Sequence, residues 1–388
     1  RVARELAGDG VNIDVVRRRA RTGFKAGALA YGLQRARGAY AAIFDADFVV
    51  PRNFLKRTVA LMTAADDIAC VQGRWGHLNR DENVLTRAQS VGIDGHFTAE
   101  QGARSYNGLC MNFNGTGGLW RVDAIAAAGG WSGDTLTEDL DLSYRVQLNG
   151  YRIVYDYDLV CRAEIPNNAA ALKGQQKRWA KGSIETAIKL VPAIFRSPRF
   201  SWVQKVEAFM HLTHYTVSVL MLLLCLCTLP VLLTVPMLSV GWLLTALWSV
   251  IVLSAMAPCV MYTTSGLVQR HGGFSLLHFP AMLAVGTGLC VNNANAVFEA
   301  VLGRRSAFIR TPKSGSSATE SKAGRYRARS GLVLGLLELV LGGYCAFTFL
   351  IYLDSGKYLF GFFMGAYAVG LVAMGTSPVL QLMRVPSR

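Results

Sequence analysis

The chain has 388 residues, of which 52% are hydrophobic and only 17% are charged, a balance too apolar for an ordinary soluble protein. A large share of its net charge of +15 lies between Arg304 and Arg329, and beside apolar segments such a cluster marks a cytoplasmic loop more often than a nucleic-acid-binding patch. The eight cysteines include no CxxC pair, so neither a disulfide framework nor a zinc site is expected.

The first half of the chain mixes charges with short apolar runs and frequent glycines, as an α/β domain does. Residues 11–16 (VNIDVV) and 40–50 (YAAIFDADFVV) are predicted strands, and residues 24–38 between them have the apolar spacing of a helix. This order predicts a parallel crossover unit, in which ligands bind at the carboxyl ends of the strands. Asp45 and Asp47 lie at that end of the second strand.

Asp45 and Asp47 are candidate metal ligands. Two carboxylates one residue apart can both bind an oxygen-coordinated Mg²⁺ or Mn²⁺ when the side chain between them points to the other face. A nucleotide diphosphate needs such an ion, because the metal neutralises the leaving phosphate. Taken alone, the D-x-D pattern is equally typical of a solvated turn at the end of a strand.

The next segments continue the alternation of helices and strands. The predicted elements are a helix at 53–65, a strand at 68–75, a helical stretch at 82–101 and a glycine-rich segment at 113–131. A further helix starts near Glu138, where Thr135 and Glu138 have the spacing of a capping box, and it stops at Asn149-Gly150. Glu138 and Asp139 are either partners of the helix dipole or a site where one carboxylate takes a proton from an acceptor hydroxyl.

Two basic motifs follow. In QQKRW (residues 175–179), Arg178 can hold a diphosphate through a forked contact, and Trp179 offers an apolar face on which a pyranose ring can stack. The alternative is an amphipathic surface helix with a core tryptophan. In FIRTPK (residues 308–313), a hydroxyl and a cation are placed to contact phosphate or anionic lipid.

The second half of the chain is predicted to be a membrane domain. From Ala208 to Gln269 there is no Asp, Glu, Lys or Arg. The predicted domains are a globular one at 1–200 and a membrane one at 201–388, with spans at 211–235, 239–264, 331–353 and 358–383. If the globular half is cytoplasmic, the apolar segment 275–302 cannot cross without placing the basic loop 303–330 outside, so a helix at the membrane interface is expected there.

In this order, the motifs K-A-G, D-A-D, F-N-G-T-G-G, T-E-D, Q-Q-x-R-W and F-x-x-T-P-K resemble those of the processive family 2 glycosyltransferases, which include cellulose, hyaluronan and chitin synthases. The similarity is greatest to cellulose-synthase-like mannan and glucan synthases and their bacterial homologues. It implies a GT-A-type, Rossmann-like domain followed by transmembrane helices. Because residue 1 is Arg and the family's first strand is missing, we expect an N-terminal truncation.

The resemblance also implies a role for each motif. Asp139, next to Glu138, corresponds to the catalytic base, and Asp45 and Asp47 correspond to the metal pair, with Asp47 the more direct ligand. The implied donor contacts are Lys25, Asp45, Arg178 and the gating-loop residues Thr311 and Lys313. The implied acceptor contacts are Gln175, Trp179, Phe113, Asn114, Gly115 and Thr116.

These motifs predict a membrane-bound inverting enzyme that polymerises a hexose from UDP-glucose or GDP-mannose into a β-linked polysaccharide, and UDP-N-acetylglucosamine is less favoured. Its expected location is the bacterial inner membrane, with a cytoplasmic catalytic domain, contacts with lipids and accessory secretion subunits, and no nucleic acid. The alternative enzyme adds a single sugar to a lipid or glycan. A transporter would need charged side chains along a solute path, and Glu338 is nearly the only one in the apolar segments.

Overall fold

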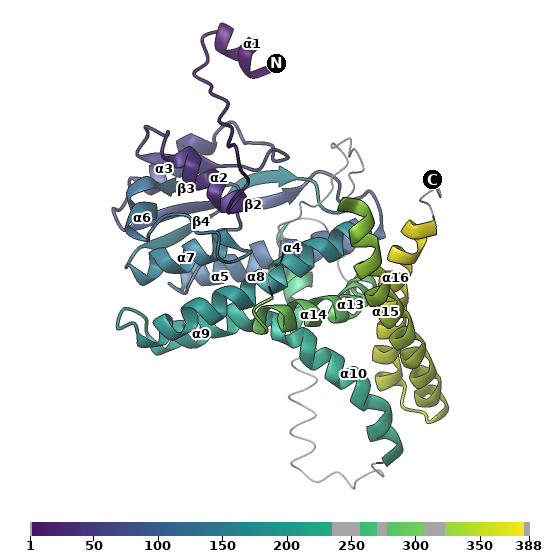
Figure 1. Cartoon of the computed structure of the whole chain (residues 1–388). Helices are drawn as coiled ribbons and strands as arrows, with labels where there is room; N and C mark the ends of the chain where they lie inside the picture. The colour runs from purple at the N-terminus through teal and green to yellow at the C-terminus, as the bar shows by residue number, and fades with distance from the viewer. Residues whose placement is uncertain (1, 235–256, 270–277, 305, 307–322, 384–388) are drawn as a thin grey trace.

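The structure is a computed structural model that describes residues 2–234, 257–269, 278–304, 306 and 323–383 (Figure 1). The FIRTPK motif, with Thr311 and Lys313, lies outside the described residues, and so does most of the predicted span 239–264. Of that span, residues 257–264 belong to a helical stretch that continues to residue 268.

The first half contains a mixed sheet of four strands. The strands are β1 (Tyr40–Ile43), β2 (Ile68–His77), β3 (Gly118–Arg121) and β4 (Arg152–Ala163), in the spatial order β1-β3-β2-β4. Strand β3 is antiparallel to both β1 and β2, whereas β2 and β4 are parallel. Strands β3 and β2 therefore lie inside the sheet, and β1 and β4 form its two edges.

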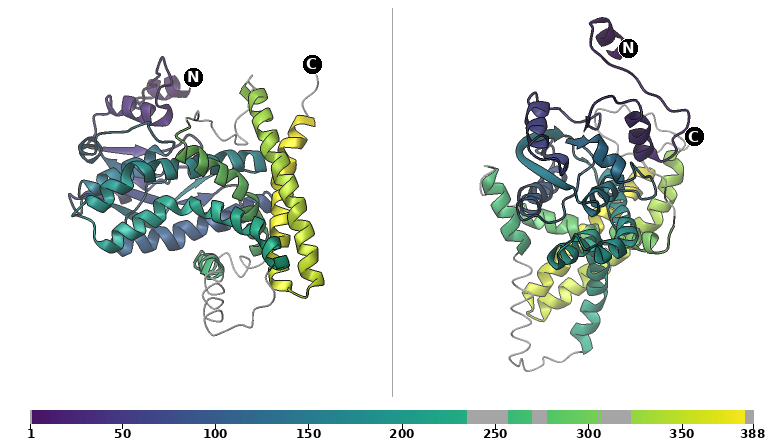
Figure 2. Two further views of the ribbon diagram at one scale, coloured as in Figure 1. Left: turned by 60° about the horizontal axis from the view of Figure 1, so that its bottom comes forward. Right: turned by 90° about the vertical axis from the view of Figure 1, so that its left-hand side faces the viewer.

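Each face of the sheet has its own cluster of buried apolar side chains. A single strand contributes to both clusters, because its successive side chains point in opposite directions. On β3, Leu119 belongs to the cluster of Phe54 and Met62 on one face, whereas Trp120 packs against Phe113 and Trp131 on the other. The helices of this half are α2 (Phe24–Leu33), α3 (Phe54–Met62), α4 (Val84–Gly95), α5 (Gln101–Tyr106), α6 (Val122–Ala127) and α7 (Glu138–Leu148). Helix α1 (Val2–Gly8) lies apart from them (Figures 1 and 2).

Two predictions about this half are wrong. Residues 11–16 are exposed and irregular, and the described neighbour of β1 is the antiparallel β3, so the parallel crossover unit is not formed. A strand needs a partner for its backbone groups, and the residues 11–16 pair with none of the described strands. The capping box of Thr135 is also absent, because α7 begins two residues later than this spacing requires, with Thr137 at its N-cap and no side-chain cap.

The second half is helical. Its elements are α9 (Trp202–Thr213), the 3₁₀ turn η2 (His214–Thr216), α10 (Val217–Thr234), α13 (Phe279–Gly288), α14 (Cys290–Val301), α15 (Ala323–Asp354) and α16 (Tyr358–Met383). Among the described residues, three stretches are long and apolar enough to cross a membrane: Trp202–Leu233, Gly331–Asp354 and Phe360–Pro378. Helices α13 and α14 are bent by 40° at their junction and together would make a fourth, so an interface helix at 275–302 stays a prediction.

Helix α8 (Ala169–Arg196) joins the two halves. It begins at Asn168, whose side chain accepts a hydrogen bond from the backbone N–H of Ala171. It runs beneath the sheet in Figure 1 and packs against α7 and α9. It also contacts α14 and α16 of the apolar bundle. In the left view of Figure 2, the long pair α15 and α16 stands across the end of this layer of helices. Motions of α8 relative to either half are therefore restricted by the other half.

Candidate functional site

The D-x-D pair follows strand β1, which is shorter than the predicted strand 40–50 and stops before the two acids. The strand ends at Ile43, and the backbone N–H of Asp45 donates to Thr116 Oγ1 at 2.9 Å. Lys25 Nζ, from the first turn of α2, lies 2.8 Å from Asp45 Oδ1 and 2.8 Å from the carbonyl oxygen of Gly115. The structure thus brings together the motifs K-A-G, D-A-D and F-N-G-T-G-G, which are far apart in the sequence. Asp47 lies half-buried in the turn that follows Asp45.

The two acids of the T-E-D motif occupy the start of α7, as predicted. Glu138 is buried, and Asp139 Oδ1 accepts a hydrogen bond from the backbone N–H of Leu140 at 2.9 Å. The glycine-rich loop reaches them at Gly115, whose φ is +84° and where a Cβ would lie 2.7 Å from Asp139 Oδ2. Only glycine adopts this backbone conformation without strain and leaves room for the carboxylate. Asp139 therefore lies against the loop that also binds Lys25.

The electrostatics of this site are those of crowded carboxylates. Burial and the charge of Asp139 raise the pKa of Glu138 to about 7, although Lys25 opposes the rise. Burial likewise raises the pKa of Asp139 against the effect of Lys25. The pKa of Lys25 is raised as well, because the charges of Asp45, Glu138 and Asp139 outweigh its own burial. A carboxylate with a raised pKa accepts protons more readily than an ordinary one, which suits a general base.

The carboxylates of this site also attract cations. Lys25 is held among the carboxylates of Asp45, Glu138 and Asp139, so the donor set consists of oxygens with a surplus of negative charge. Hard divalent cations such as Mg²⁺ and Mn²⁺ bind such oxygens. Within the described ranges, no group of three or more His, Cys, Asp or Glu side chains is arranged to hold a metal ion alone. An ion here would therefore need further oxygens from a ligand such as a diphosphate.

The Q-Q-x-R-W motif lies within α8, beside the start of α7. Gln175, Arg178 and Trp179 are all half-buried, and Arg178 Nη1 donates to the carbonyl of Gly174 at 3.3 Å. One turn further along, a Cβ on Gly182 would lie 2.5 Å from Cγ2 of Thr137. Since a helix rises about 1.5 Å per residue, Trp179 is about 5 Å along the axis from this contact. The motif is thus brought close to the T-E-D turn, although it belongs to an amphipathic helix.

Helix α8 also holds the T-E-D turn by hydrogen bonds. Glu185 Oε2 accepts from the backbone N–H of Leu136 at 2.9 Å. The hydroxyl oxygens of Thr137 and Thr186 are 3.3 Å apart. Together with the close approach at Gly182, these bonds attach the residues just before Asp139 to a single face of α8.

The F-N-G-T-G-G segment is fixed mainly by residues that the sequence analysis did not select. Gln72, fully buried on β2, accepts from the backbone N–H of Asn114 at 3.0 Å and donates to the carbonyl of Thr116 at 3.2 Å. Phe113 is buried against Trp120, so its side chain belongs to the core and supports the loop from below. A glutamine inside the apolar run IACVQ was the available signal for this role.

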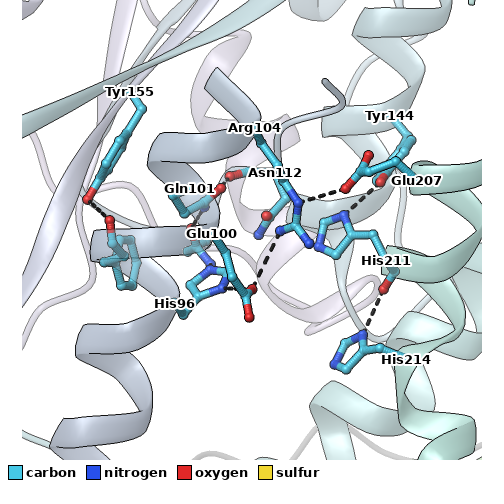
Figure 3. Close-up of polar contacts among 12 residues, drawn as sticks. His96, Glu100, Gln101, Arg104, Asn112, Tyr144, Tyr155, Glu207, His211 and His214 are labelled. Atoms are coloured by element: carbon cyan, nitrogen blue, oxygen red, sulfur yellow. Dashed lines mark hydrogen bonds and ion pairs between the residues drawn. The ribbon is translucent and has the colours of Figure 1, made fainter. Parts of the chain in front are cut away.

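A polar network continues from Asn114 toward α9, and Figure 3 shows its part between His96 and Glu207. Gln101 Nε2 donates to Asn114 Oδ1 at 2.7 Å, and His96 Nε2 lies 3.3 Å from Asn114 Nδ2. His96 belongs to a single π turn, η1 (His96–Glu100), and its Nδ1 lies 2.8 Å from Glu100 Oε2. Burial opposes the charge of Glu100, but the hydrogen bond and charge of His96 and the charge of Arg104 lower its pKa to about 2.

Two contacts attach this network to α9 and α7. Arg104 Nε donates to Glu207 Oε1 at 2.8 Å, and the Tyr144 hydroxyl lies 2.7 Å from His211 Nδ1 (Figure 3). Tyr144 is a buried residue of α7, the helix that begins with Glu138 and Asp139. Helix α9, which begins the first apolar stretch, is therefore linked by polar contacts both to the network around the glycine-rich loop and to α7.

Comparisons with known proteins show the family to which the chain belongs. The sequence profile of the family described as "Glycosyl transferase family group 2" matches residues 40–289. Glucomannan 4-beta-mannosyltransferase 2 of Arabidopsis thaliana is 41% identical over 203 residues, which are 52% of this chain and 38% of that enzyme. Glucomannan 4-beta-mannosyltransferase 1 of Oryza sativa subsp. japonica is 40% identical over 201 residues, 51% of this chain and 39% of that enzyme. In both alignments the chain spans about two-fifths of its relative.

A longer alignment includes the apolar half. Glucomannan 4-beta-mannosyltransferase 9 of Arabidopsis thaliana is 31% identical over 387 residues, 95% of this chain and 70% of that enzyme. Among solved structures, "Mannosyltransferase PcManGT from Pyrobaculum calidifontis in complex with GDP-Man and Mn2+" has a TM-score of 0.42 and 17% identity, and covers 76% of this chain and 70% of that chain. The family match confirms the predicted GT-A-type α/β class for the first half.

Proposed function

Because the chain belongs to glycosyl transferase family group 2, we propose that it is a membrane-bound inverting β-glycosyltransferase that polymerises a hexose into a β-linked polysaccharide. The observation that carries the proposal is that Lys25 and Asp139 meet at Gly115, while Lys25 also forms an ion pair with Asp45. The relatives are named mannosyltransferases, which favours GDP-mannose over UDP-glucose as the donor.

The chemistry follows from the site. The carboxylate of Asp139 takes the proton of the acceptor hydroxyl, whose oxygen forms a bond to the anomeric carbon as the bond to the diphosphate breaks. Trp179 stacks against the terminal acceptor sugar, and Arg178 and Lys313 hold the departing diphosphate. A Mg²⁺ or Mn²⁺ ion bound by Asp47 and Asp45 would supply further neutralisation of the diphosphate charge. Lys25 binds the donor and holds Asp45 through their ion pair.

A non-processive transferase is the second candidate. Trp179 favours processive synthesis, because a stacking surface retains the end of the polymer after each addition. The two are distinguished by the product: a high polymer or a ladder supports polymerisation, and a single added sugar supports the alternative.

We further propose that the apolar stretches cross a bacterial inner membrane, that the globular half faces the cytoplasm, and that the product leaves between the helices with the help of secretion subunits. Three such stretches among the described residues support a membrane location. Lys25 and Arg178 would then meet the donor on the cytoplasmic side, where nucleotide sugars are made.

The test is sugar transfer by the full-length protein in membranes, first with GDP-mannose and UDP-glucose in turn, followed by linkage analysis. Asp139→Asn is expected to abolish transfer and to leave donor binding within about threefold, because it removes the base without changing the shape of the site. Asp158→Asn, at an exposed position of β4, is the matched control and should keep full activity. Continued polymerisation by Asp139→Asn would exclude the proposed mechanism.

A further inference from the structure

Glu338 is the charged residue of the apolar segment 331–353, and the proposed chemistry does not use it. Its side chain is fully buried in α15, and its Oε2 lies 2.6 Å from Lys173 Nζ. Lys173 is buried as well and belongs to the first turns of α8, in the globular half. The ion pair thus joins the helix that carries the Q-Q-x-R-W motif to a helix of the apolar bundle.

We infer that the Lys173–Glu338 ion pair positions α8, and with it Gln175 and Trp179, against the membrane helices during transfer. This inference rests on the proposed function for its catalytic readout. Lys173 and Glu338 are positioning residues in it, since neither has a described contact with Asp139 or the D-x-D pair.

The first argument is the cost of the charges. A carboxylate buried among apolar helices is costly unless a cation and hydrogen bonds compensate it. Glu338 Oε1 has no hydrogen-bond partner among the residues described, so this carboxylate depends on Lys173. Separation of α8 from α15 would leave two buried charges unpaired. The pair therefore favours one docked position of α8 strongly over displaced ones.

The second argument is that neighbouring contacts hold the same point of α8. Asn292 of α14 donates from Nδ2 to the backbone carbonyl of Lys173 at 3.1 Å and is itself buried. Farther along α8, Lys177 Nζ lies 2.6 Å from Glu299 Oε1, at a more exposed position. Lys173, Lys177 and the fully buried Lys181 follow each other at intervals of four residues, so they form one stripe on the helix.

The third argument is that the face of α8 opposite Lys173 points toward the candidate site. Gly182 is nine residues, two and a half turns, after Lys173, so the two project from opposite sides of α8. The Gly182 side packs on Thr137 of the T-E-D turn, and Gln175 and Trp179 are also turned away from the lysine stripe by helical geometry. A shift of α8 at Lys173 is therefore transmitted through a rigid helix to the motif and to the turn before Asp139.

The test uses Glu338→Gln in the full-length protein in membranes. We expect polymer formation to fall at least about tenfold and the product to shorten, because displacement of a positioning element by about 1 Å has a large effect on rate. The KM for the donor should stay within about twofold, since Lys25 and Asp45 are untouched. Lys173→Arg, which keeps the charge, should retain activity within about threefold.

The matched control is Glu299→Gln, which breaks the more exposed pair on the same stripe and should change product length little. The double variant Lys173→Met/Glu338→Met removes both charges, so it should fold and melt like the unmodified protein but still make short product. Full activity and normal product length in either Glu338→Gln or the double variant would overturn the inference.

A structural readout separates this inference from the proposed function. Amide hydrogen exchange of residues 169–182 should be faster in Glu338→Gln than in Glu299→Gln, while β2 and β4 remain protected. If the unmodified protein transfers no sugar, the proposed function fails, yet faster exchange in Glu338→Gln would still support the docking role. Unchanged exchange in that variant would overturn the docking role whatever the activity.

Discussion

Replacement of Gly182 by alanine should separate α8 from the turn that precedes Asp139, the proposed catalytic base. A Cβ at this position would lie 2.5 Å from Cγ2, 2.6 Å from Oγ1 and 2.8 Å from the backbone nitrogen of Thr137. The side chain of Thr137 can rotate but its backbone nitrogen cannot, so the two elements must move apart by about 1 Å to reach normal contact. Overpacking of this kind costs about 1–3 kcal/mol.

The catalytic effect should exceed the loss of stability. Asp139 follows Thr137 by two residues, so a displacement of the turn by about 1 Å moves the base and should lower kcat about 100-fold. Gly174→Ala is the matched control on the same helix, because no atom lies within 4 Å of its Cβ position. That variant should raise the free energy of unfolding by about 0.5–1 kcal/mol and keep its activity. Equal melting temperatures and equal rates for the two variants would refute the reasoning.

Three further predictions concern the carboxylates. Because the pKa of Glu138 is about 7 in the folded protein and ordinarily 4.5, stability should fall as pH rises through this window. Without added divalent cations, Glu138→Gln should therefore raise the free energy of unfolding at pH 8 by at most about 3 kcal/mol and hardly at all near pH 4, which a pH series of melting curves would check. For the same reason, kcat/KM should decline as pH falls through about 7, since protonation of the Glu138–Asp139 pair removes the base, and a profile flat to pH 5 would contradict the assignment. Gly115→Ala should lose at least about tenfold in kcat, because its φ of +84° is strained for alanine and its Cβ would lie 2.7 Å from Asp139 Oδ2. Gly108→Ala is the control for backbone strain alone, because Gly108 has a φ of +64° but open space around its Cβ position.

Local sequence patterns predicted the parts of the site that lie at the ends of single elements. The apolar residues of 40–50 predicted a strand at the D-x-D pair, although the observed strand ends at Ile43, and Asn149-Gly150 marked the end of the helix that starts at Glu138. These features depend on burial and on backbone conformation within a few residues, so a short stretch of sequence contains them. The position of Asp139 at the start of a helix was predictable for the same reason.

Strand pairing was not predictable in this way. Residues 11–16 alternate apolar and polar side chains as an edge strand does, yet the ladder beside β1 is formed by β3, which lies more than seventy residues later. Which strand occupies that place depends on long-range packing, here of Trp120 against Trp131 and of Leu119 in the cluster of Phe54, rather than on local preference.

The long-range polar contacts were equally hidden. The position of Gln72 in an apolar run signals that the side chain has a buried partner, but it does not show that this partner is Asn114. His96 and Glu100 are one turn apart, a spacing that occurs on many exposed helices, so their link to the glycine-rich loop becomes visible only in three dimensions. A motif read from sequence therefore identified the residues at the site but not those that hold them in place.

The environment of Glu338 in the apolar bundle favours an enzyme over a transporter. A solute path needs ionisable side chains that face a water-filled cavity between the spans. Glu338 instead is fully buried and lies 2.6 Å from Lys173, a residue of the globular half. Its charge is thus compensated within the protein and serves the contact between the two halves. Because the helix that supplies Lys173 also packs on the turn before Asp139, the arrangement favours an enzyme whose chemistry depends on its membrane helices over a carrier with a nucleotide-binding attachment.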